Sequence, residues 1–407
     1  MAWRWLGLAI TLDLFLVRLY NMAMARRTEF VTYRPKTILN KGKRADHWFW
    51  TRYSAYPYKG CQHRCLFCYC RERKYCPFED LNDFGYVVQV KENAPELLRR
   101  ALRRAPVDIV ATGDYQPAEK KFEVSRRMLE VCLELGFPVS ILERSPLVLR
   151  DLDLIKEIDA RAPSVVFFSL ISAPDSPTYE RVREMENLAP RMEKRYAAME
   201  QVARVGILTG ISMMPILPGL CDPDENLEAT IRATANHGGR FVVAGGLTLA
   251  DQQRDYFFGV LRERFPDLLA LYERMYPHPT ASYGGIRAGD PHAIGRRIRE
   301  LCRQYGISDR MPRPIIPGDK RALNKRIVEA LANECYWLEL DNAPKQRVWA
   351  YRKAAWAIED TEQDLGLIYR AMGRRGLESI ENVGPRLAEV VEGLLNELLA
   401  SPVAMGG

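Results

Sequence analysis

The middle of the chain alternates between short β-rich runs and longer amphipathic segments. Five apolar runs resemble strands: VDIVATG (107–113), FPVSILE (137–143), SVVFFSL (164–170), GILTGISMMP (206–215) and RFVVAG (240–245). Apolar residues recur at helical spacing in segments 95–104, 119–136, 149–161, 190–205 and 224–237. This alternation indicates βαβ units and a parallel sheet. About six such units are expected, fewer than the eight of a closed barrel, so the expected fold is α/β with a partial (βα)6 barrel.

The strand pattern ends at a segment rich in proline and glycine, GISDRMPRPIIPGDK (306–320), which is typical of a domain boundary. Beyond it only helical patterns occur: NKRIVEALANECYWLEL, QRVWAYRKAAWAIED, EQDLGLIYRAMGRRG and GPRLAEVVEGLLNELL. The sequence therefore predicts an N-terminal extension (1–30), a core domain (31–305), a linker (306–320) and an all-α domain (321–400).

The first residues, MAWRWLGLAITLDLFLVRLYNM, resemble a signal or anchor only superficially. Asp13 and Arg18 interrupt an apolar run that is already shorter than the ~20 residues of a membrane span. A later start at Met22 or Met24 and a short amphipathic helix are the two interpretations of this segment. We expect a cytoplasmic protein without a membrane partner.

Charge and composition restrict the class of protein. A chain of 407 residues with 47% hydrophobic and 27% charged residues is typical of a packed protein with two or more domains. The net charge of +7 is unevenly placed, because thirteen Lys and Arg face only three acidic residues between Arg26 and Lys74. Such a stretch suits a polyanionic partner, and a solvated basic face is the alternative.

Three of the nine cysteines lie within eight positions, in YPYKGCQHRCLFCYC. Three thiolates with C-x3-C-x2-C spacing can each ligate one iron of a cubane cluster and leave the fourth iron open for a small molecule. The alternatives are a redox-active disulfide, buried thiols, or a zinc site drawn from Cys61, Cys65, Cys68, Cys70 and Cys76. Structural zinc usually takes paired C-x2-C elements further apart, or histidines at set spacing, and the sequence has neither.

This cysteine motif, with the aromatic Phe67 just before the third cysteine, resembles that of the radical S-adenosylmethionine (SAM) superfamily. The resemblance implies a 4Fe-4S cluster on Cys61, Cys65 and Cys68, with the amino and carboxylate groups of SAM on the fourth iron. It also implies reductive cleavage of SAM to a 5′-deoxyadenosyl radical, with electrons from a donor such as flavodoxin or ferredoxin. The cofactor carries the difficult chemistry, and the protein positions and shields it.

The segments ATGDYQPAEKK, ERSPLVLRDLDLIKEI and MPILPGLCD resemble motifs of the spore photoproduct lyase-like branch, over about residues 31–305. The resemblance places Thr112, Gly113 and Asp114 beside SAM and Ser169 at its ribose. Arg144 stands where the branch has a lysine that meets the carboxylate of SAM, and a guanidinium can bind a carboxylate bidentately. Solvated loop residues are the alternative interpretation for all five.

Two departures from that branch concern hydrogen transfer. Photoproduct lyases have tyrosine on both sides of the third cysteine, whereas here only Tyr69 remains, as the candidate catalytic residue. Neither Cys132 nor Cys221 lies where the branch has its hydrogen-donor cysteine. These losses argue against the identical reaction, so the sequence does not predict a thymine-dimer lyase.

The tail resembles the N-terminal helix-hairpin-helix domain of family X DNA polymerases, over about residues 321–400, in NKRIVEALANE, RVWAYRKAAWAIE and ENVGPRLAEVVEGLL. In the hairpin, Asn382 replaces the usual first glycine and Gly384 is the second. The resemblance implies phosphate binding by backbone N–H groups of the hairpin. The DNA-contact candidates are Arg347, Tyr351, Arg352, Lys353, Gly384 and Arg386. Val390 occupies the place of the family's Schiff-base lysine, which predicts binding without cleavage.

Three functions remain in competition. The first is a radical SAM enzyme, lyase-like, that repairs or modifies a base in DNA. The second is a radical SAM enzyme on RNA or a small molecule, with the tail as a helical cap that packs on the barrel. The third is a non-enzymatic iron-sulfur sensor that binds DNA. The five histidines, His47, His63, His237, His278 and His292, form no ligand-spaced set and receive no role.

Overall fold

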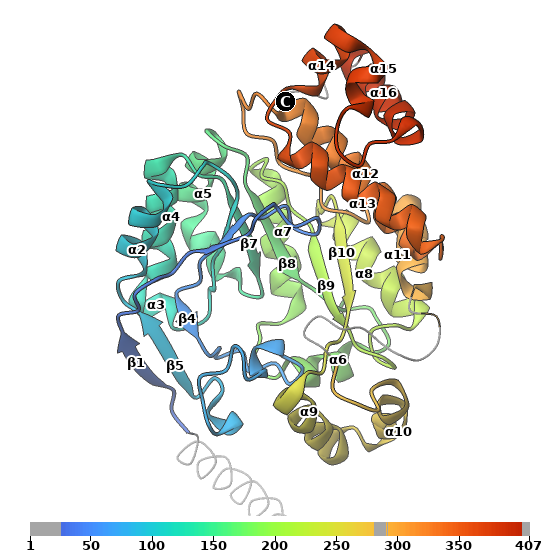
Figure 1. The fold of residues 1–407 in the computed structure, drawn as a ribbon. Helices are drawn as coiled ribbons and strands as arrows, with labels where there is room; N and C mark the ends of the chain where they lie inside the picture. Colours follow the sequence, from blue (N-terminus) through green and yellow to red (C-terminus); the bar gives the residue numbers. More distant parts are fainter. Residues whose placement is uncertain (1–25, 281–289, 291, 401–407) are drawn as a thin grey trace, which may run out of the picture.

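A curled seven-stranded sheet forms the centre of the molecule (Figure 1). The computed structural model describes residues 26–280, 290 and 292–400, so the expectations for the first twenty-two residues lie outside the described part. The strands are β2 (Asn40–Lys41), β3 (Tyr53–Ser54), β6 (Val110–Thr112), β7 (Val139–Glu143), β8 (Val165–Ser169), β9 (Ile211–Ile216) and β10 (Val242–Gly246). Their order in the sheet is β10-β9-β8-β7-β6-β3-β2.

The six strands from β3 to β10 in this sheet are mutually parallel, and only β2 runs antiparallel, against β3. The predicted parallel α/β fold with a partial barrel is therefore confirmed. Five of the six parallel strands follow the cysteines, where the sequence predicts about six βα units, and β3 precedes them. All five residues of β8 are buried, which explains its continuous apolar run.

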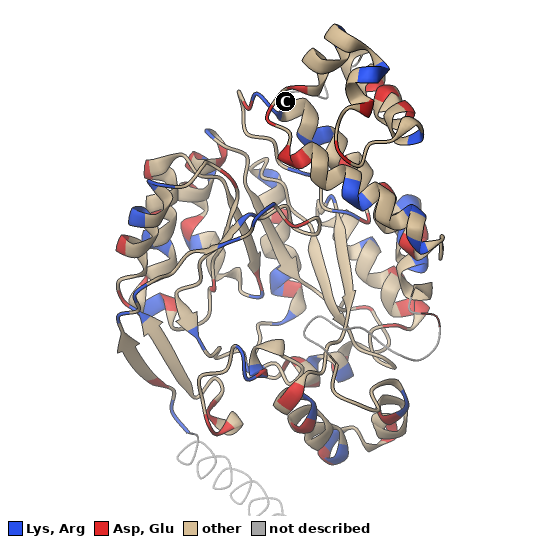
Figure 2. Ribbon diagram, viewed as in Figure 1, with Lys and Arg blue, Asp and Glu red and all other residues tan. Residues whose placement is uncertain are grey.

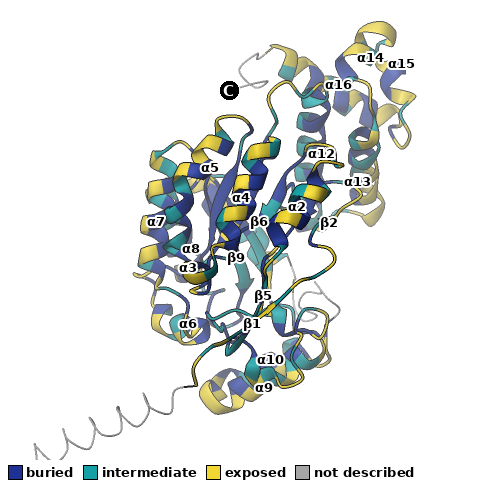
Figure 3. Ribbon diagram, turned by 90° about the vertical axis from the view of Figure 1, so that its left-hand side faces the viewer, coloured by how far each residue is buried: buried dark blue, intermediate teal, exposed yellow. Residues whose placement is uncertain are grey.

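Helices cover the outer face of the sheet (Figures 1 and 3). They are α2 (Ala94–Leu102), α3 (Glu119–Phe122), α4 (Val124–Leu135), α5 (Leu152–Asp159), α7 (Met192–Arg204) and α8 (Asp224–Asn236), whereas α6 (Tyr179–Glu186) lies near the carboxyl ends of the strands. Local sequence fixes several of their ends. Pro95 lies in the first turn of α2. Gly136 caps the C-terminus of α4 with φ of 70°, a left-handed conformation that glycine adopts easily because it has no β-carbon. Strands β8, β9 and β10 contain no charged residue, whereas the outer helices mix both signs (Figure 2).

A small second sheet supports the cysteine segment. It consists of β1 (Glu29–Tyr33), β5 (Val87–Lys91) and β4 (Tyr58–Lys59), in the order β1-β5-β4. Six further helices complete the described part of the chain up to residue 305. Three are short 3-10 helices, η1 (Tyr69–Arg71), η2 (Leu81–Asp83) and η3 (Pro146–Asp151), and three are α-helices, α9 (Asp251–Arg264), α10 (Pro266–Met275) and α11 (Ala293–Gln304).

The end of the chain is helical, as the sequence predicts: α12 (Ala322–Leu340), α13 (Lys345–Asp360), α14 (Leu365–Met372), α15 (Arg374–Glu378) and α16 (Pro385–Ala400). The third predicted segment forms two helices, because the chain bends at Gly373, where φ is 61°. None of the helices in the described part combines the length and the apolar character that a membrane crossing needs.

These last helices share a hydrophobic core with the barrel. Ile327 and Leu331 of α12 and Ala355 of α13 belong to one buried cluster with Val165 and Phe241, which lie where strands β8 and β10 begin. The indole N–H of Trp50 donates to the Met311 carbonyl at 2.9 Å within the same region. The C-terminal helices thus close the end of the barrel at which the strands start, and α9 and α10 lie at the other end (Figure 1).

Candidate active site

The cysteine segment follows β4 and is shaped by local turns. Gly60, directly before Cys61, has φ of +80°, and a β-carbon there would stand 2.6 Å from the Val87 carbonyl oxygen, so this position requires glycine. The Cys68 amide donates to the Cys65 carbonyl at 3.2 Å. The Leu66 amide donates to the Met185 carbonyl at 2.9 Å, which fixes the segment to the end of α6.

Burial dominates the thiol chemistry of the motif. Burial raises the pKa of Cys61 well above its usual range and that of Cys65 to about 11, and the neighbouring cysteines raise the Cys61 pKa further. Cys68 differs, because a hydrogen bond with the Cys70 thiol, aided by Arg71 and Arg144, lowers its pKa to about 6. The three thiols of the motif therefore lie within electrostatic reach of one another.

This arrangement suits a cluster rather than a single ion. No group of three His, Cys, Asp or Glu residues in the described ranges is spaced to hold one metal ion. Thiolates of a cubane cluster each bind a different iron, so they stand further apart than the ligands of one ion. The buried hydroxyl of Thr112, at the end of β6, has no hydrogen-bond partner in the structure. The donor set and this orphaned polar atom fit a 4Fe-4S cluster with a small polar ligand beside it.

The turn after β6 brings a carboxylate pair to the same end of the sheet. Gly113 has φ of +130° and Asp114 has φ of 81°. Glu143, at the end of β7, accepts from the Asp114 amide at 2.5 Å and from the Tyr115 amide at 3.0 Å. A β-carbon on Gly113 would stand 2.7 Å from the Glu143 Oε1. Glu143 thus holds the backbone of this turn in its unusual conformation.

The two carboxyl groups share a buried environment. Burial raises the pKa of Asp114 to about 7 and that of Glu143 to about 8, and each carboxylate faces further negative charge. Gln116 connects the pair to the cysteine segment, because its Nε2 donates to Asp114 Oδ1 at 3.1 Å and to the Gly60 carbonyl at 3.0 Å. Its Oε1 accepts from the Gln62 amide at 3.0 Å. The strand-end turn and the cysteine segment therefore form one connected unit.

Arg144 lies between the cysteines and a buried ion-pair network. Its guanidinium stands 5.2 Å from the centroid of the Phe67 ring, and Nη1 donates to Glu186 Oε1 at 2.6 Å. Glu186 is fully buried and also binds Arg183 and the fully buried Arg195. Burial opposes ionisation of Glu186, but Arg195 and Arg144 hold its pKa below the ordinary value. Three cations around one carboxylate leave an excess of positive charge beside the thiols, which suits an anionic cluster and a carboxylate ligand.

The remaining candidates of the core domain occupy different positions. Ser169 ends β8 and is buried, and its carbonyl accepts from Arg195 Nη1 at 2.9 Å. Phe67 is buried, and its carbonyl accepts from Gln253 Nε2 at 3.1 Å. Tyr69 begins η1, and about half of its surface is exposed. Its ring meets Tyr75 edge to face at 5.4 Å, and its hydroxyl hydrogen-bonds the Cys70 thiol.

The DNA-contact candidates divide into two groups. Arg347, Lys353, Gly384 and Arg386 are exposed. Tyr351 is half-buried and packs between α12 and α13. Arg352 binds Glu339 at 2.6 Å and lies over the Trp349 ring. The first four residues are therefore at the surface, whereas Tyr351 and Arg352 are partly buried and contact neighbouring residues of α12 and α13.

Sequence reasoning missed Glu143, Glu186, Arg195 and Gln116. Glu143 and Gln116 lie inside the quoted motifs, next to Arg144 and two residues after Asp114, so strand-end placement could have found them. Glu186 and Arg195 belong to helices α6 and α7, and α6 carries no strong apolar pattern. Their burial follows only from the tertiary arrangement.

We predict that Glu143→Ala weakens SAM binding by about tenfold or more, because the turn of Gly113 and Asp114 loses its acceptor. Equilibrium dialysis of SAM against the reconstituted, unreduced enzyme measures the dissociation constant. Glu143→Gln keeps an acceptor oxygen and should bind nearly as wild type. Glu130→Ala, on the exposed face of α4, is the control. Equal affinities for the alanine variant and wild type would show that the turn does not depend on Glu143.

Fold and site together define an iron-sulfur protein built on a partial (βα)6 barrel, with its cysteines at the carboxyl ends of the strands. Residues 56–234 match the family described as the Radical SAM superfamily. The chain is 30% identical over 274 residues to uncharacterized proteins of Mycobacterium bovis and Mycobacterium tuberculosis, covering 65% of this chain and 77% of each relative. An uncharacterized protein of Methanocaldococcus jannaschii is 28% identical over 200 residues, covering 49% of this chain and 72% of that protein. The chain belongs to the radical SAM superfamily, and its cofactors are a 4Fe-4S cluster and SAM.

Solved structures of spore photoproduct lyase are also similar. A mutant of that enzyme aligns with a TM-score of 0.49 and 15% identity, covering 69% of this chain and 81% of that chain. Another mutant, solved with bound AdoMet and dinucleoside spore photoproduct, aligns with a TM-score of 0.48 and 14% identity, covering 68% and 80%.

Proposed function

We propose that this radical SAM enzyme acts on DNA, where it repairs a lesion or modifies a base, and that it belongs to the spore photoproduct lyase-like branch. The chemistry that bound cluster and SAM supply is a 5′-deoxyadenosyl radical. The residues of this chain would then position SAM and the target base. An enzyme that works on a base inside a duplex needs the nucleotide extruded or the strand single.

The exposed hairpin before α16 carries the DNA part of the proposal. Asn382 adopts the left-handed conformation with φ of 61°, Val383 is buried beneath it, and Gly384 is exposed. The Gly384 carbonyl accepts from the Ala388 amide at 2.9 Å, so Gly384 caps the helix. The amides of the first turn have no acceptor within the helix, which is the arrangement that binds a phosphate. Lys353 and Asn382 line one hollow of about 330 Å³ next to this turn.

In the barrel, we assign SAM contacts to Thr112, Gly113, Asp114, Arg144 and Ser169. Arg144 keeps Nη2 directed at the Met214 carbonyl at 3.5 Å, a weak contact that a carboxylate could replace. Tyr69 is the proposed hydrogen donor to a substrate radical, because its phenol is half-exposed beside the cysteine segment. The excess positive charge around Glu186 would favour the anionic cluster and the carboxylate group of SAM there.

Reversing two charges near the hairpin should weaken DNA binding. For the double variant Lys353→Glu with Arg386→Glu, we expect at least about tenfold lower affinity and a salt slope smaller by about 2. Fluorescence anisotropy with duplex, gapped and single-stranded DNA at several salt concentrations measures both. The control, Lys156→Glu with Arg264→Glu, makes the same charge change on exposed positions of α5 and α9. An equal loss of DNA affinity in both double variants would show that the net charge of the protein, and not the hairpin, causes the effect.

The proposal is tested by anaerobic incubation of the reconstituted enzyme with SAM, dithionite and irradiated DNA, followed by nucleoside mass spectrometry. We expect 5′-deoxyadenosine together with a changed nucleoside. Cleavage of SAM with unchanged nucleosides would contradict the DNA assignment and direct the search to RNA. Absence of 5′-deoxyadenosine would favour the third function, an iron-sulfur sensor.

One observation favours the second function, an enzyme on RNA or a small molecule with a structural tail. The C-terminal helices share a buried core with Val165 and Phe241 at the starting ends of the strands, whereas the cysteines lie at the other ends. A tail in this position stabilises the barrel whether or not it touches nucleic acid. Failure of the chain to bind any DNA form at low salt would support this function over the first.

A further inference from the structure

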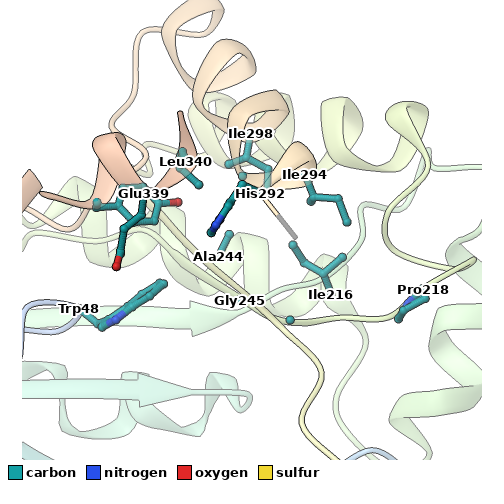
Figure 4. A pocket seen from close by; sticks show the side chains of 13 residues that line it. Trp48, Ile216, Pro218, Ala244, Gly245, His292, Ile294, Ile298, Glu339 and Leu340 are labelled. Carbon is teal, nitrogen blue, oxygen red and sulfur yellow. The ribbon is translucent and has the colours of Figure 1, made fainter. Parts of the chain in front are cut away.

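A cavity of about 240 Å³ lies between the open edge of the barrel and the C-terminal helices (Figure 4). Ile216 and the run Ala244 to Gly246 line it from the carboxyl ends of β9 and β10. Trp48 lines it from the loop between β2 and β3, and Glu339 from the end of α12. Its volume is below the roughly 300–1,000 Å³ of pockets for drug-sized ligands, so it suits one small ring system.

Trp48 is held as a flat wall of this cavity. The guanidinium of the buried Arg310 stands 4.9 Å from the centroid of the Trp48 ring and 4.5 Å from that of Tyr336. Tyr336 also meets Trp48 edge to face at 5.8 Å. Arg310 and Tyr336 fix the ring in place, and 39% of Trp48 remains exposed. A fixed aromatic ring with a free face is the arrangement on which planar ligands stack.

A hydrogen-bond acceptor lies beside this wall. The Glu339 carboxylate extends toward Trp48 (Figure 4). Its Oε1 accepts from Arg352 Nη2 at 2.6 Å, which holds the side chain and leaves Oε2 for a ligand. A carboxylate oxygen selects a planar group that carries N–H donors. Ile294, Ile298 and Leu340 add apolar walls, and His292 and Tyr336 also line the cavity.

The floor of the cavity adjoins the proposed cofactor site. A β-carbon on Gly245 would stand 3.1 Å from the end of the Met214 side chain. The Met214 carbonyl accepts from Arg144 Nη2 at 3.5 Å. One residue, Met214, therefore separates the cavity from the arginine assigned to the SAM carboxylate. A ligand in the cavity would lie on the same side of the sheet as the reacting centre.

We infer that this cavity holds a single nucleobase, stacked on Trp48 and hydrogen-bonded through its amino group to Glu339. The inference rests on the proposed function, because it takes nucleic acid as the substrate. It names the bases with an exocyclic amino group, cytosine, guanine and adenine, as the class of group bound. The flat wall, the acceptor and the size of the space select this class together.

The test uses the full-length, cluster-loaded chain saturated with SAM and left unreduced, so that SAM occupies its own site. Isothermal titration with 2′-deoxycytidine and 2′-deoxyguanosine measures binding. Gly246→Leu places a bulky side chain at the cavity, because Gly246 lines the cavity and a β-carbon there meets no atom within 4 Å. Gly259→Leu is the matched control, because this glycine of α9 is equally open and lies outside the cavity.

We expect wild type and Gly259→Leu to bind both nucleosides, and Gly246→Leu and Trp48→Ala to bind at least about tenfold more weakly. Trp48→Phe keeps a stacking ring and should retain most of the affinity. An unchanged thermal unfolding midpoint shows that each variant is folded. Equal binding by wild type, Gly246→Leu and Trp48→Ala, or no binding by wild type, overturns the inference.

The two proposals fail in different ways. If wild type binds no nucleoside but still forms 5′-deoxyadenosine and binds DNA, the cavity assignment is wrong and the proposed function stands. Binding of nucleosides that depends on Trp48 and Gly246, in a protein that forms no 5′-deoxyadenosine, supports the cavity and rejects the enzyme activity.

Discussion

Cys65→Ala should reduce bound iron from about four atoms per chain to less than about one and lower 5′-deoxyadenosine formation more than about a hundredfold. Cys65 is buried within electrostatic reach of Cys68 and Arg144. Removing one of three ligands leaves a second iron without a protein ligand, and the cluster is then lost. Iron and sulfide analysis of anaerobic material, with chromatography of the reaction, measures both quantities.

Cys132→Ala is the matched control for that experiment. Cys132 is fully buried in α4, and burial raises its pKa to about 12, so it is a structural thiol. This variant should keep its iron and its activity. Full iron occupancy in Cys65→Ala, or equal loss in both variants, would contradict the assignment of the cluster to Cys61, Cys65 and Cys68.

Glu186→Gln should lower the free energy of unfolding by about 3–5 kcal/mol. The change removes the charge that Arg144, Arg183 and Arg195 share, and leaves buried cations without a counterion. The pKa of Glu186 is depressed in the folded protein, so its contribution is full above the ordinary carboxyl pKa of about 4.3 and is lost as the pH falls through the lower folded value. Urea unfolding at neutral and acidic pH measures the difference.

Glu180→Gln provides the comparison within the same helix, because the Glu180 side chain is 78% exposed. Its effect on unfolding should stay within about 0.5 kcal/mol. The deficit of Glu186→Gln should also shrink below about pH 4, because the unfolded wild-type chain then binds a proton at Glu186 that the folded chain binds only at lower pH. A deficit that persists unchanged in acid would show that packing rather than charge produces it.

The parallel sheet was predictable because β6 to β10 are mostly buried and form apolar runs, and SVVFFSL at β8 is the clearest case, with all five strand residues buried. The helices α4 and α8 were predictable from their apolar spacing. The second sheet was not, because β1 and β4 are short, half-exposed and paired through the distant β5. Two-residue strands leave no periodic pattern, and long-range pairing alone defines them.

The candidate site shows the same division. Cys61, Cys65 and Cys68 follow one another closely, so spacing alone identified them. Glu186 and Arg195 could not be identified from the sequence, because only the packing of α6 and α7 against each other brings them together in a buried ion pair. Trp48 and Glu339 lie almost three hundred positions apart in the sequence and meet at one cavity.

The core that α12 and α13 share with the strand starts has a consequence for any attempt to divide the chain. A polypeptide ending at residue 320 would expose Val165, Phe167 and Phe241 to water as an apolar patch that promotes aggregation. The barrel would then associate with itself or with chaperones instead of remaining dispersed. Substitutions could therefore remove every nucleic-acid contact of the tail, and the tail would still be needed to cover the apolar core at the strand starts.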